Sequence, residues 1–182
     1  MCRAKVMLNC FYSLFARTFL TAMKFVHLIE INAVNNPLIP PLTREQLWHG
    51  LVIRAERPTL FQLGLDSCEI IERSSDHLAR VLRFGQLVIH DSVRFEFMQQ
   101  VLYHVPEQNE IPVSDLSMTI EEPQPGALFV RFEYDDHLPE NEDSENAIYN
   151  DFRRSAYEES DIDTIRVIRQ LADQGQLDAP LQ

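Results

Sequence analysis

Apolar and polar positions alternate clearly from Lys24 to Asn32, near the start of the chain. A period of two is typical of a strand, so this stretch is predicted to be the first strand of a sheet. One set of alternate positions, which we expect to share a face, consists of Phe25, His27, Ile29 and Ile31. Prolines at positions 37, 40 and 41 then favour an extended loop.

The pattern changes to a helical period after this loop. Thr43 and Gln46 have the spacing of a capping box, which predicts a helix beginning at Thr43. One face of this helix is apolar, through Leu47, Trp48, Leu51 and Val52. The charged positions expected largely towards water are Arg44, Glu45, Arg54 and Glu56. Pro58 is expected to end the helix, with one short helical turn over residues 59–63.

Strand-like runs dominate the segment from Cys68 to Tyr134. They are separated by turn-forming stretches at 74–76, 84–86, 106–112 and 123–126. A change of register at 98–100 predicts one further tight hairpin or bulge. These breaks divide the segment into six predicted strands. One parity is mainly apolar and the other polar, so one face of the sheet is expected to be buried and the other solvated.

A single long helix is expected at the end of the chain. Ser144 is a candidate N-cap, and Gly175 lies just past a periodic stretch that reaches about Ala172. The predicted apolar stripe consists of Ile148, Phe152, Tyr157, Ile162, Ile165, Ile168 and Leu171. A helix of about 28 residues spans roughly 42 Å. The order of elements predicts an α+β fold, in which a curved seven-stranded antiparallel sheet wraps around the long C-terminal helix and encloses a cavity.

The first 22 residues differ in composition from the rest. They contain no acidic residue, and Arg3, Lys5 and Arg17 interrupt their apolar positions, which disfavours a secretory signal and a spanning helix. Two interpretations stay open: an over-extended start before Met23, or a peripheral or targeting extension. We expect residues 1–22 outside the fold, one domain over 23–174, and a tail at 175–182.

The formal net charge is −12, which disfavours binding to phosphate backbones and to acidic phospholipid surfaces. We therefore expect no nucleic-acid partner and no stable membrane insertion. The three scattered cysteines fit neither a disulfide framework nor a zinc site. A cytoplasmic location is the simplest expectation, and both a monomer and a homodimer remain open.

Cofactor-binding motifs are absent from the sequence. The six histidines lack the spacing of a zinc-binding helix, and the five glycines form no phosphate-binding loop. We expect neither a metal nor an organic cofactor.

Two charged residues interrupt the apolar parity of neighbouring predicted strands. Arg80 lies between Leu78 and Leu82, and Asp91 occupies the matching parity beyond Gly85. A hairpin around Gly85 would bring both onto the concave face, where arginine can donate two hydrogen bonds to a carboxylate. We interpret them as candidate catalytic residues that orient a ligand or act as an acid–base pair, while a purely structural pair, or a register that exposes both, stays open.

Four stretches carry a resemblance to a known family. They are FVHLIEIN, LTREQLWHGLVIRAERPTLF, LSMTIEEPQPGALFVRFEY and DIDTIRVIR. These motifs, in this order, resemble the AtaL-like branch of the START/Bet v 1 (SRPBCC) superfamily, over Met23 to about Leu171. The branch is named after a protein of the acetylaranotin biosynthesis cluster. The resemblance implies a helix-grip fold, and relatives in the wider superfamily bind sterols, lipids and polyketides or cyclise polyketides; it transfers no established catalytic motif.

Two main classes of function follow. The first is binding of a small hydrophobic or amphipathic molecule. The residues expected to line its site are Phe95, Phe97, Tyr103, Met118, Phe132, Tyr134, Phe152 and Tyr157. The second is a cofactor-free cyclase, dehydratase or isomerase using Arg80 and Asp91, for which Asp91→Asn should abolish turnover and spare affinity. A protein-interaction module with a filled interior is the third alternative.

Overall fold

The structure is a computed structural model that describes residues 24–32, 39–109, 111–137 and 144–178, with side chains in the last segment described from 150 onward. The predicted extension 1–22 and residues 179–182 of the predicted tail lie outside the described residues. The elements are β1 (Lys24–Glu30), α2 (Arg44–Glu56), the short 3-10 helix η1 (Pro58–Leu60), β2 (Ser67–Arg73), β3 (His77–Phe84), β4 (Leu87–Glu96), β5 (Gln100–Val105), β6 (Ser114–Glu121), β7 (Phe129–Asp135) and α3 (Ser144–Asp173).

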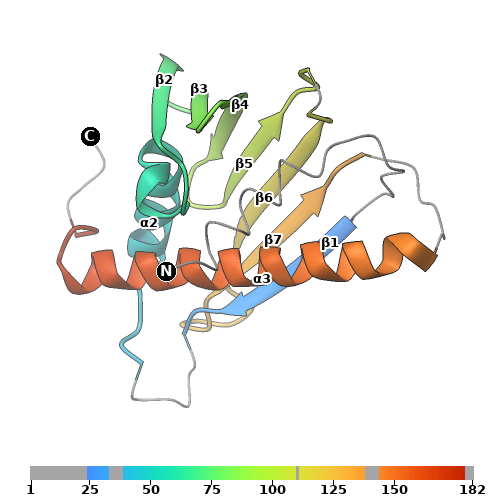
Figure 1. The fold of residues 1–182 in the computed structure, drawn as a ribbon. Coiled ribbons are helices and arrows are strands. Elements are labelled where there is room, and N and C mark those ends of the chain that lie inside the picture. Colours follow the sequence, from blue (N-terminus) through green and yellow to red (C-terminus); the bar gives the residue numbers. More distant parts are fainter. Residues whose placement is uncertain (1–23, 33–38, 110, 138–143, 179–182) are drawn as a thin grey trace.

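The seven strands form one antiparallel sheet in the order β1-β7-β6-β5-β4-β3-β2. Among these seven strands, only the β1–β7 pairing joins strands that are distant in sequence. Each of the other pairings joins two strands that follow one another along the chain. Figure 1 shows α3 running across the sheet with α2 beside its C-terminal part. The predicted fold class, a seven-stranded antiparallel sheet with a long C-terminal helix, is confirmed.

Local sequence signals explain the boundaries of α2. The Thr43 side chain accepts a hydrogen bond from the Gln46 backbone N–H, and the Gln46 side-chain oxygen accepts one from the Thr43 backbone N–H, so the predicted capping box is present. The helix ends at Glu56, before Pro58 begins η1.

Two tight turns place the central strands in register. Gly85 has a φ of +61° in the turn between β3 and β4, a conformation that side-chain-bearing residues rarely adopt. The predicted hairpin at 98–100 is also present, with Met98 at a φ of 60° between β4 and β5. Because both turns are tight, the strands keep the apolar parity that the sequence predicts.

Both helices cover the same face of the sheet and complete the main core. Leu47 and Leu51 of α2 and Ile168 of α3 are fully buried with the inward side chains of the strands. Each such side chain contributes roughly 1.5–3 kcal/mol on burial. The helices approach closely at Gly50, where an added Cβ would lie 2.6 Å from Ile168 Cγ2.

Two predictions about the helices are wrong. Arg54, expected towards water, is buried, because it lies three residues after Leu51 and therefore on the inward face of α2. Ile162, expected in the inward stripe of α3, is exposed. It follows Tyr157 by five residues, which places the two about 140° apart around the helix. The residues of α3 buried near that turn are Asp161, Thr164 and Ile165.

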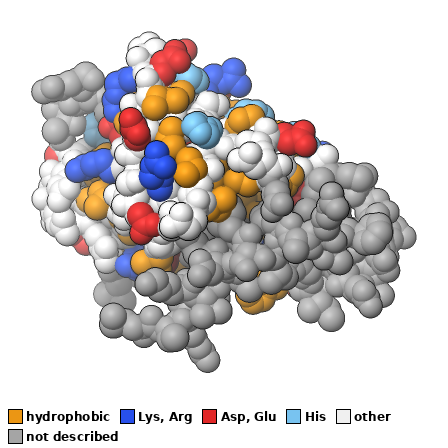
Figure 2. All heavy atoms as spheres, turned by 45° about the horizontal axis from the view of Figure 1, so that its top comes forward, with side chains coloured by type: hydrophobic (Ala, Val, Ile, Leu, Met, Phe, Trp, Pro, Cys, Tyr) orange, Lys and Arg blue, Asp and Glu red, His pale blue; other side chains and the backbone are white. Residues whose placement is uncertain are grey.

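The described surface mixes side chains of different kinds. In Figure 2, acidic, basic, histidine and apolar side chains alternate over the described part of the face shown, with no gathering of basic groups there. Neither α2 nor α3, within the part of the chain that the structure describes, has the combination of length and hydropathy that a membrane span requires.

Candidate functional site

A cavity of about 230 Å³ lies between the sheet and the two helices. Its walls come from β3 to β7, from Arg54 of α2, and from Arg153 and Tyr157 of α3. Leu82, Ile89 and Leu116 provide apolar surface. Arginine, aspartate and tyrosine side chains also line it, so the cavity is amphipathic.

Arg80 and Asp91 are directly opposite each other on β3 and β4, as predicted. Arg80 Nε donates to Asp91 Oδ1 at 2.9 Å, and its Nη2 donates to Asp91 Oδ2. Its Nη1 donates to the Ala55 carbonyl at 2.5 Å. Both side chains are buried and line the cavity. Because these contacts use most of the hydrogen-bonding capacity of the guanidinium, the pair is well suited to a structural role.

A second buried arginine, Arg54, reaches the cavity from α2. Its Nε donates to Thr164 Oγ1 at 3.2 Å, and its Cζ lies 5.1 Å from the centre of the Tyr103 ring. Arg80 Cζ lies 5.3 Å from the same ring. Tyr103 therefore has two guanidinium groups close to its ring, a cation–π arrangement. The Tyr103 hydroxyl is buried and has no hydrogen-bond partner among the described residues.

Three residues from distant parts of the chain form a partly buried hydrogen-bonded network around the buried carboxylate of Asp161. The Tyr134 hydroxyl donates to Asp161 Oδ1 at 2.5 Å, and His27 Nδ1 lies 3.1 Å from Asp161 Oδ2. The rings of Tyr134 and Tyr157 stack with centroids 4.1 Å apart, and both line the cavity. Tyr134 is thus the member of the network that connects Asp161 to the cavity.

Burial sets the acidity of this network. It raises the pKa of Asp161 from its ordinary 3.8 to about 6, although the hydrogen bonds from Tyr134 and His27 oppose the rise. Burial and the nearby Asp161 carboxylate raise the pKa of Tyr134 well above 10. At neutral pH, Tyr134 therefore carries its proton beside a carboxylate that can accept one.

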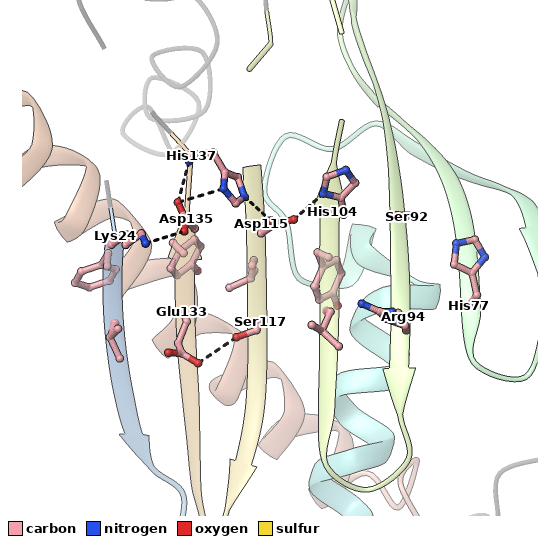
Figure 3. A pocket seen from close by; sticks show the side chains of 16 residues that line it. Lys24, His77, Ser92, Arg94, His104, Asp115, Ser117, Glu133, Asp135 and His137 are labelled. Carbon is pink, nitrogen blue, oxygen red and sulfur yellow. Dashed lines mark hydrogen bonds and ion pairs between the residues drawn. The ribbon is translucent and has the colours of Figure 1, made fainter. Parts of the chain in front are cut away.

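A larger hollow, of about 780 Å³, lies on the outer face of the sheet (Figure 3). Asp115 contacts His104 Nδ1 at 2.7 Å and His137 Nε2 at 2.5 Å. Burial raises the pKa of Asp115, but the two histidine contacts outweigh it and leave the pKa below its ordinary value. Ser117 and Glu133 also pair with each other. Because these polar groups satisfy one another on the solvated face, we favour the inner cavity as the functional site.

No set of three or more His, Cys, Asp or Glu side chains in the described ranges is arranged to hold a metal ion. A second, smaller apolar cluster consists of Leu65, Leu82, Ile89 and Ile111, and Cys68 packs half-buried against it. Burial raises the pKa of the Cys68 thiol, which disfavours its thiolate.

The structure separates the eight residues expected to line a ligand site. Tyr103, Tyr134 and Tyr157 line the cavity. Met118 and Phe132 are fully buried in the main core. Phe95 is half-buried with its ring edge against Trp48.

Phe97 and Phe152 do not lie in the cavity wall. Phe97 is 71% exposed because β4 ends at Glu96, so the strand parity does not extend into the turn. Phe152 is 49% exposed and, five residues before Tyr157, points about 140° away from it around α3.

Sequence reasoning missed Arg54 and Asp161 as members of the site. Both are charged residues at inward helical positions, and a stripe defined by hydrophobic residues does not include them. A signal was available for Asp161, which follows Tyr157 by four residues and precedes Ile168 by seven, positions that share a helical face. His27 also had the inward parity of Phe25 and Ile29.

Comparison with solved structures places the fold among known helix-grip proteins. The di-domain ARO/CYC protein StfQ of the steffimycin biosynthetic pathway matches with a TM-score of 0.64 and 6% identity over 86% of this chain. The chain covers 52% of StfQ, about half of its length. The Zhui aromatase/cyclase from Streptomyces sp. R1128 matches with a TM-score of 0.58 and 10% identity, over 84% of this chain and 94% of that one.

Ara h 8.0201 also matches, with a TM-score of 0.53 and 11% identity, over 81% of this chain and 99% of that one. These identities are low, so the likeness establishes the fold alone. Comparison with curated proteins returns no match.

A family model described as acetylaranotin biosynthesis cluster protein L matches residues 29–175. This range contains α2, α3 and the strands from β2 to β7, but only the last two residues of β1. The resemblance inferred from four sequence stretches is therefore confirmed over most of the chain, and the protein belongs to the AtaL family.

Proposed function

We propose that this chain binds a small amphipathic molecule in the cavity between the sheet and α3. The observation that carries the proposal is a pair of buried polar atoms in the wall of this amphipathic cavity that have no hydrogen-bond partner among the described residues. Tyr103 Oη and Gln62 Oε1 have no hydrogen-bond partner among the described residues, and both residues line the cavity. Buried polar groups are normally satisfied, so a ligand with its own polar atoms would complete the site.

The cavity volume limits the size of this molecule. Ligand sites for drug-sized molecules usually measure about 300–1,000 Å³. At 230 Å³, the cavity has roughly the liquid volume of eight water molecules. We therefore expect a ligand of one or two rings, or a short chain of similar size, and not a long polyketide enclosed as a whole.

The test compares two tryptophan variants that fill the two hollows. Val105 lines the inner cavity and Val26 lines the outer one, so Val105→Trp and Val26→Trp make the same change in side-chain size at the competing sites. Each protein is examined by native mass spectrometry and then by denaturing extraction of any molecule that co-purifies. We expect a bound small molecule in wild type and Val26→Trp and its loss in Val105→Trp. Loss only in Val26→Trp would contradict the proposal and assign binding to the outer hollow.

One observation favours catalysis as a second candidate function. The Tyr134 hydroxyl lies between the cavity and Asp161, with a 2.5 Å hydrogen bond to the carboxylate. As a ligand proton moves to the Tyr134 oxygen, the tyrosine proton passes to Asp161, and the reverse transfer returns a proton to the product. Such proton transfer serves cofactor-free cyclisation, dehydration or isomerisation. Two of the structural neighbours are named for aromatase/cyclase activity, which supports this class by analogy.

Proton exchange on a one-ring ketone tests this second function. Acetophenone in D₂O is followed by NMR for deuterium entering its methyl group, which requires removal of a carbon-bound proton. We expect the chain to accelerate exchange, and Tyr134→Phe to abolish the acceleration while acetophenone still binds. Exchange that proceeds equally in Tyr134→Phe would remove this hydroxyl from the mechanism and leave the binding function standing.

A further inference from the structure

Arg54 has hydrogen-bonding capacity that the described protein does not use. The residue is only 4% exposed, yet its single side-chain hydrogen bond among the described residues runs from Nε to Thr164 Oγ1. A guanidinium has five N–H donors, so four remain without an acceptor among the described residues. Since Arg54 lines the cavity, these donors lie where a ligand can meet them.

The charge of Arg54 also lacks a contacting carboxylate. The other two arginines that line the cavity have one: Arg80 pairs with Asp91, and Arg153 Nη1 lies 2.9 Å from Asp136 Oδ2. No carboxylate of the described residues lies within 4.0 Å of the Arg54 guanidinium nitrogens. Asp161 interacts with Arg54 electrostatically at longer range, but its oxygens contact Tyr134 and His27. A buried charge without a direct partner is costly, and an anionic ligand would remove that cost.

Tyr103 extends the same site. Its ring contacts the Arg54 guanidinium, with Cζ 5.1 Å from the ring centre, and its buried hydroxyl has no partner among the described residues. A carboxylate oxygen accepts both guanidinium and hydroxyl hydrogens, and the planar fork of arginine matches a carboxylate. A phosphate dianion would call for a second free cation, whereas Arg80 and Arg153 are already paired.

We propose that Arg54, beside Tyr103, binds the carboxylate of a small organic acid whose apolar body lies against Leu82, Ile89 and Leu116. This inference rests on the proposed binding function and specifies the chemical class of the ligand. Arg54 supplies recognition of the negative charge, and the apolar wall accommodates the ring or chain.

Two isosteric probes, 1-naphthoate and the neutral 1-naphthamide, test the inference by isothermal titration calorimetry at neutral pH. Hydrogen bonds to charged groups correspond to about tenfold to hundredfold in affinity, so wild type is expected to prefer the carboxylate by a factor in that range. Arg54→Met should abolish the preference and retain binding of the amide, while Arg54→Lys should keep part of it. Arg57→Met removes an exposed arginine three residues away and should leave the preference unchanged.

The outcomes separate the two proposals. Equal affinity of wild type for both probes, or a preference that survives Arg54→Met, would overturn the carboxylate site and leave the cavity as a general binding site. Failure of wild type to bind either probe would overturn the proposed function itself. Thermal unfolding of each variant shows whether it is folded. Where a variant is not folded, equal affinity of wild type for the two probes would still overturn the carboxylate site.

Discussion

The hydroxyl of Tyr134 donates a 2.5 Å hydrogen bond to Asp161, a carboxylate with no exposed surface on the inward face of α3. The two residues are 27 positions apart and come from the last strand and the last helix. A buried carboxylate is unusual on a helix face that otherwise packs against a sheet. Because burial gives this carboxyl a different pKa in the folded state than in the unfolded state, the stability of the fold depends on pH.

Asp161→Asn is expected to change how stability varies with pH. Because the folded state raises the pKa of Asp161 from 3.8 to about 6, it binds this proton more tightly than the unfolded state. Its contribution to stability is therefore most favourable below pH 4, falls as pH rises to 6, and stays constant above. At about 1.4 kcal/mol per pKa unit, the change is on the order of 3 kcal/mol. Asparagine does not titrate. The free energy of unfolding of Asp161→Asn, relative to that of wild type, should therefore rise by this amount between pH 4 and pH 7.

Urea unfolding at pH 4, 5, 6 and 7 measures this difference. Asp163→Asn is the matched control, since Asp163 lies on the same helix but pairs with Arg166 at the surface. Parallel stability curves for wild type and Asp161→Asn would show that Asp161 titrates alike in the folded and unfolded states.

Breaking the Arg80–Asp91 pair is expected to destabilise the fold strongly. Arg80→Met leaves a buried carboxylate unpaired, and Asp91→Leu leaves a buried guanidinium, each at a cost of about 3–5 kcal/mol. The double variant should cost clearly less than the sum of the two, because no charge then stays unpaired. Denaturant unfolding of the four proteins measures the coupling.

The Arg131–Glu121 pair provides an exposed comparison for the buried Arg80–Asp91 pair. It has similar geometry, with Nε–Oε1 at 2.5 Å, but both side chains are about one-third exposed. Breaking it should cost far less than breaking the Arg80–Asp91 pair, because solvent screens exposed ion pairs. Equal costs at the two pairs would contradict the importance of burial for Arg80 and Asp91.

Gly50→Ala is expected to destabilise the contact between α2 and α3. Alanine favours a helix by about 1 kcal/mol over glycine. The new Cβ, however, would lie 2.6 and 2.7 Å from two carbons of Ile168, and overpacking of this kind costs about 1–3 kcal/mol. The clash should prevail in wild type, whereas in an Ile168→Ala background Gly50→Ala should be neutral or stabilising. Thermal unfolding of the four proteins distinguishes these signs; destabilisation by Gly50→Ala in both backgrounds would rule out the clash with Ile168.

Phe97→Ser is expected to have little effect on stability or on ligand binding. The side chain is 71% exposed and contacts Trp48 only at its edge, with ring centroids 5.9 Å apart. Surface substitutions usually change stability by about 0.5 kcal/mol or less. Met118→Ala, in the core, should cost about 2–5 kcal/mol. Calorimetric titration with 1-naphthoate checks the binding expectation, and a large loss of affinity in Phe97→Ser would place the ligand outside the cavity.

Local patterns were sufficient to predict the elements and their order. The Thr43 capping box, the Gly85 turn and the alternating strands all depend on residues close together in sequence. The Arg80–Asp91 contact was predictable for the same reason, because a tight turn determines which residues of adjacent strands face each other. Eleven positions separate the two residues.

The cavity chemistry depends on contacts between distant segments. Arg54 meets Thr164 across 110 positions, and His27 meets Asp161 across 134. Polarity alone predicts such side chains at the surface, since burial is costly unless a partner is present. Only the packing of α2 and α3 across the sheet decides which partners are present. The sequence by itself therefore determined the framework and its faces, whereas the tertiary structure decided which polar side chains are buried and which of their hydrogen-bonding groups remain for a ligand.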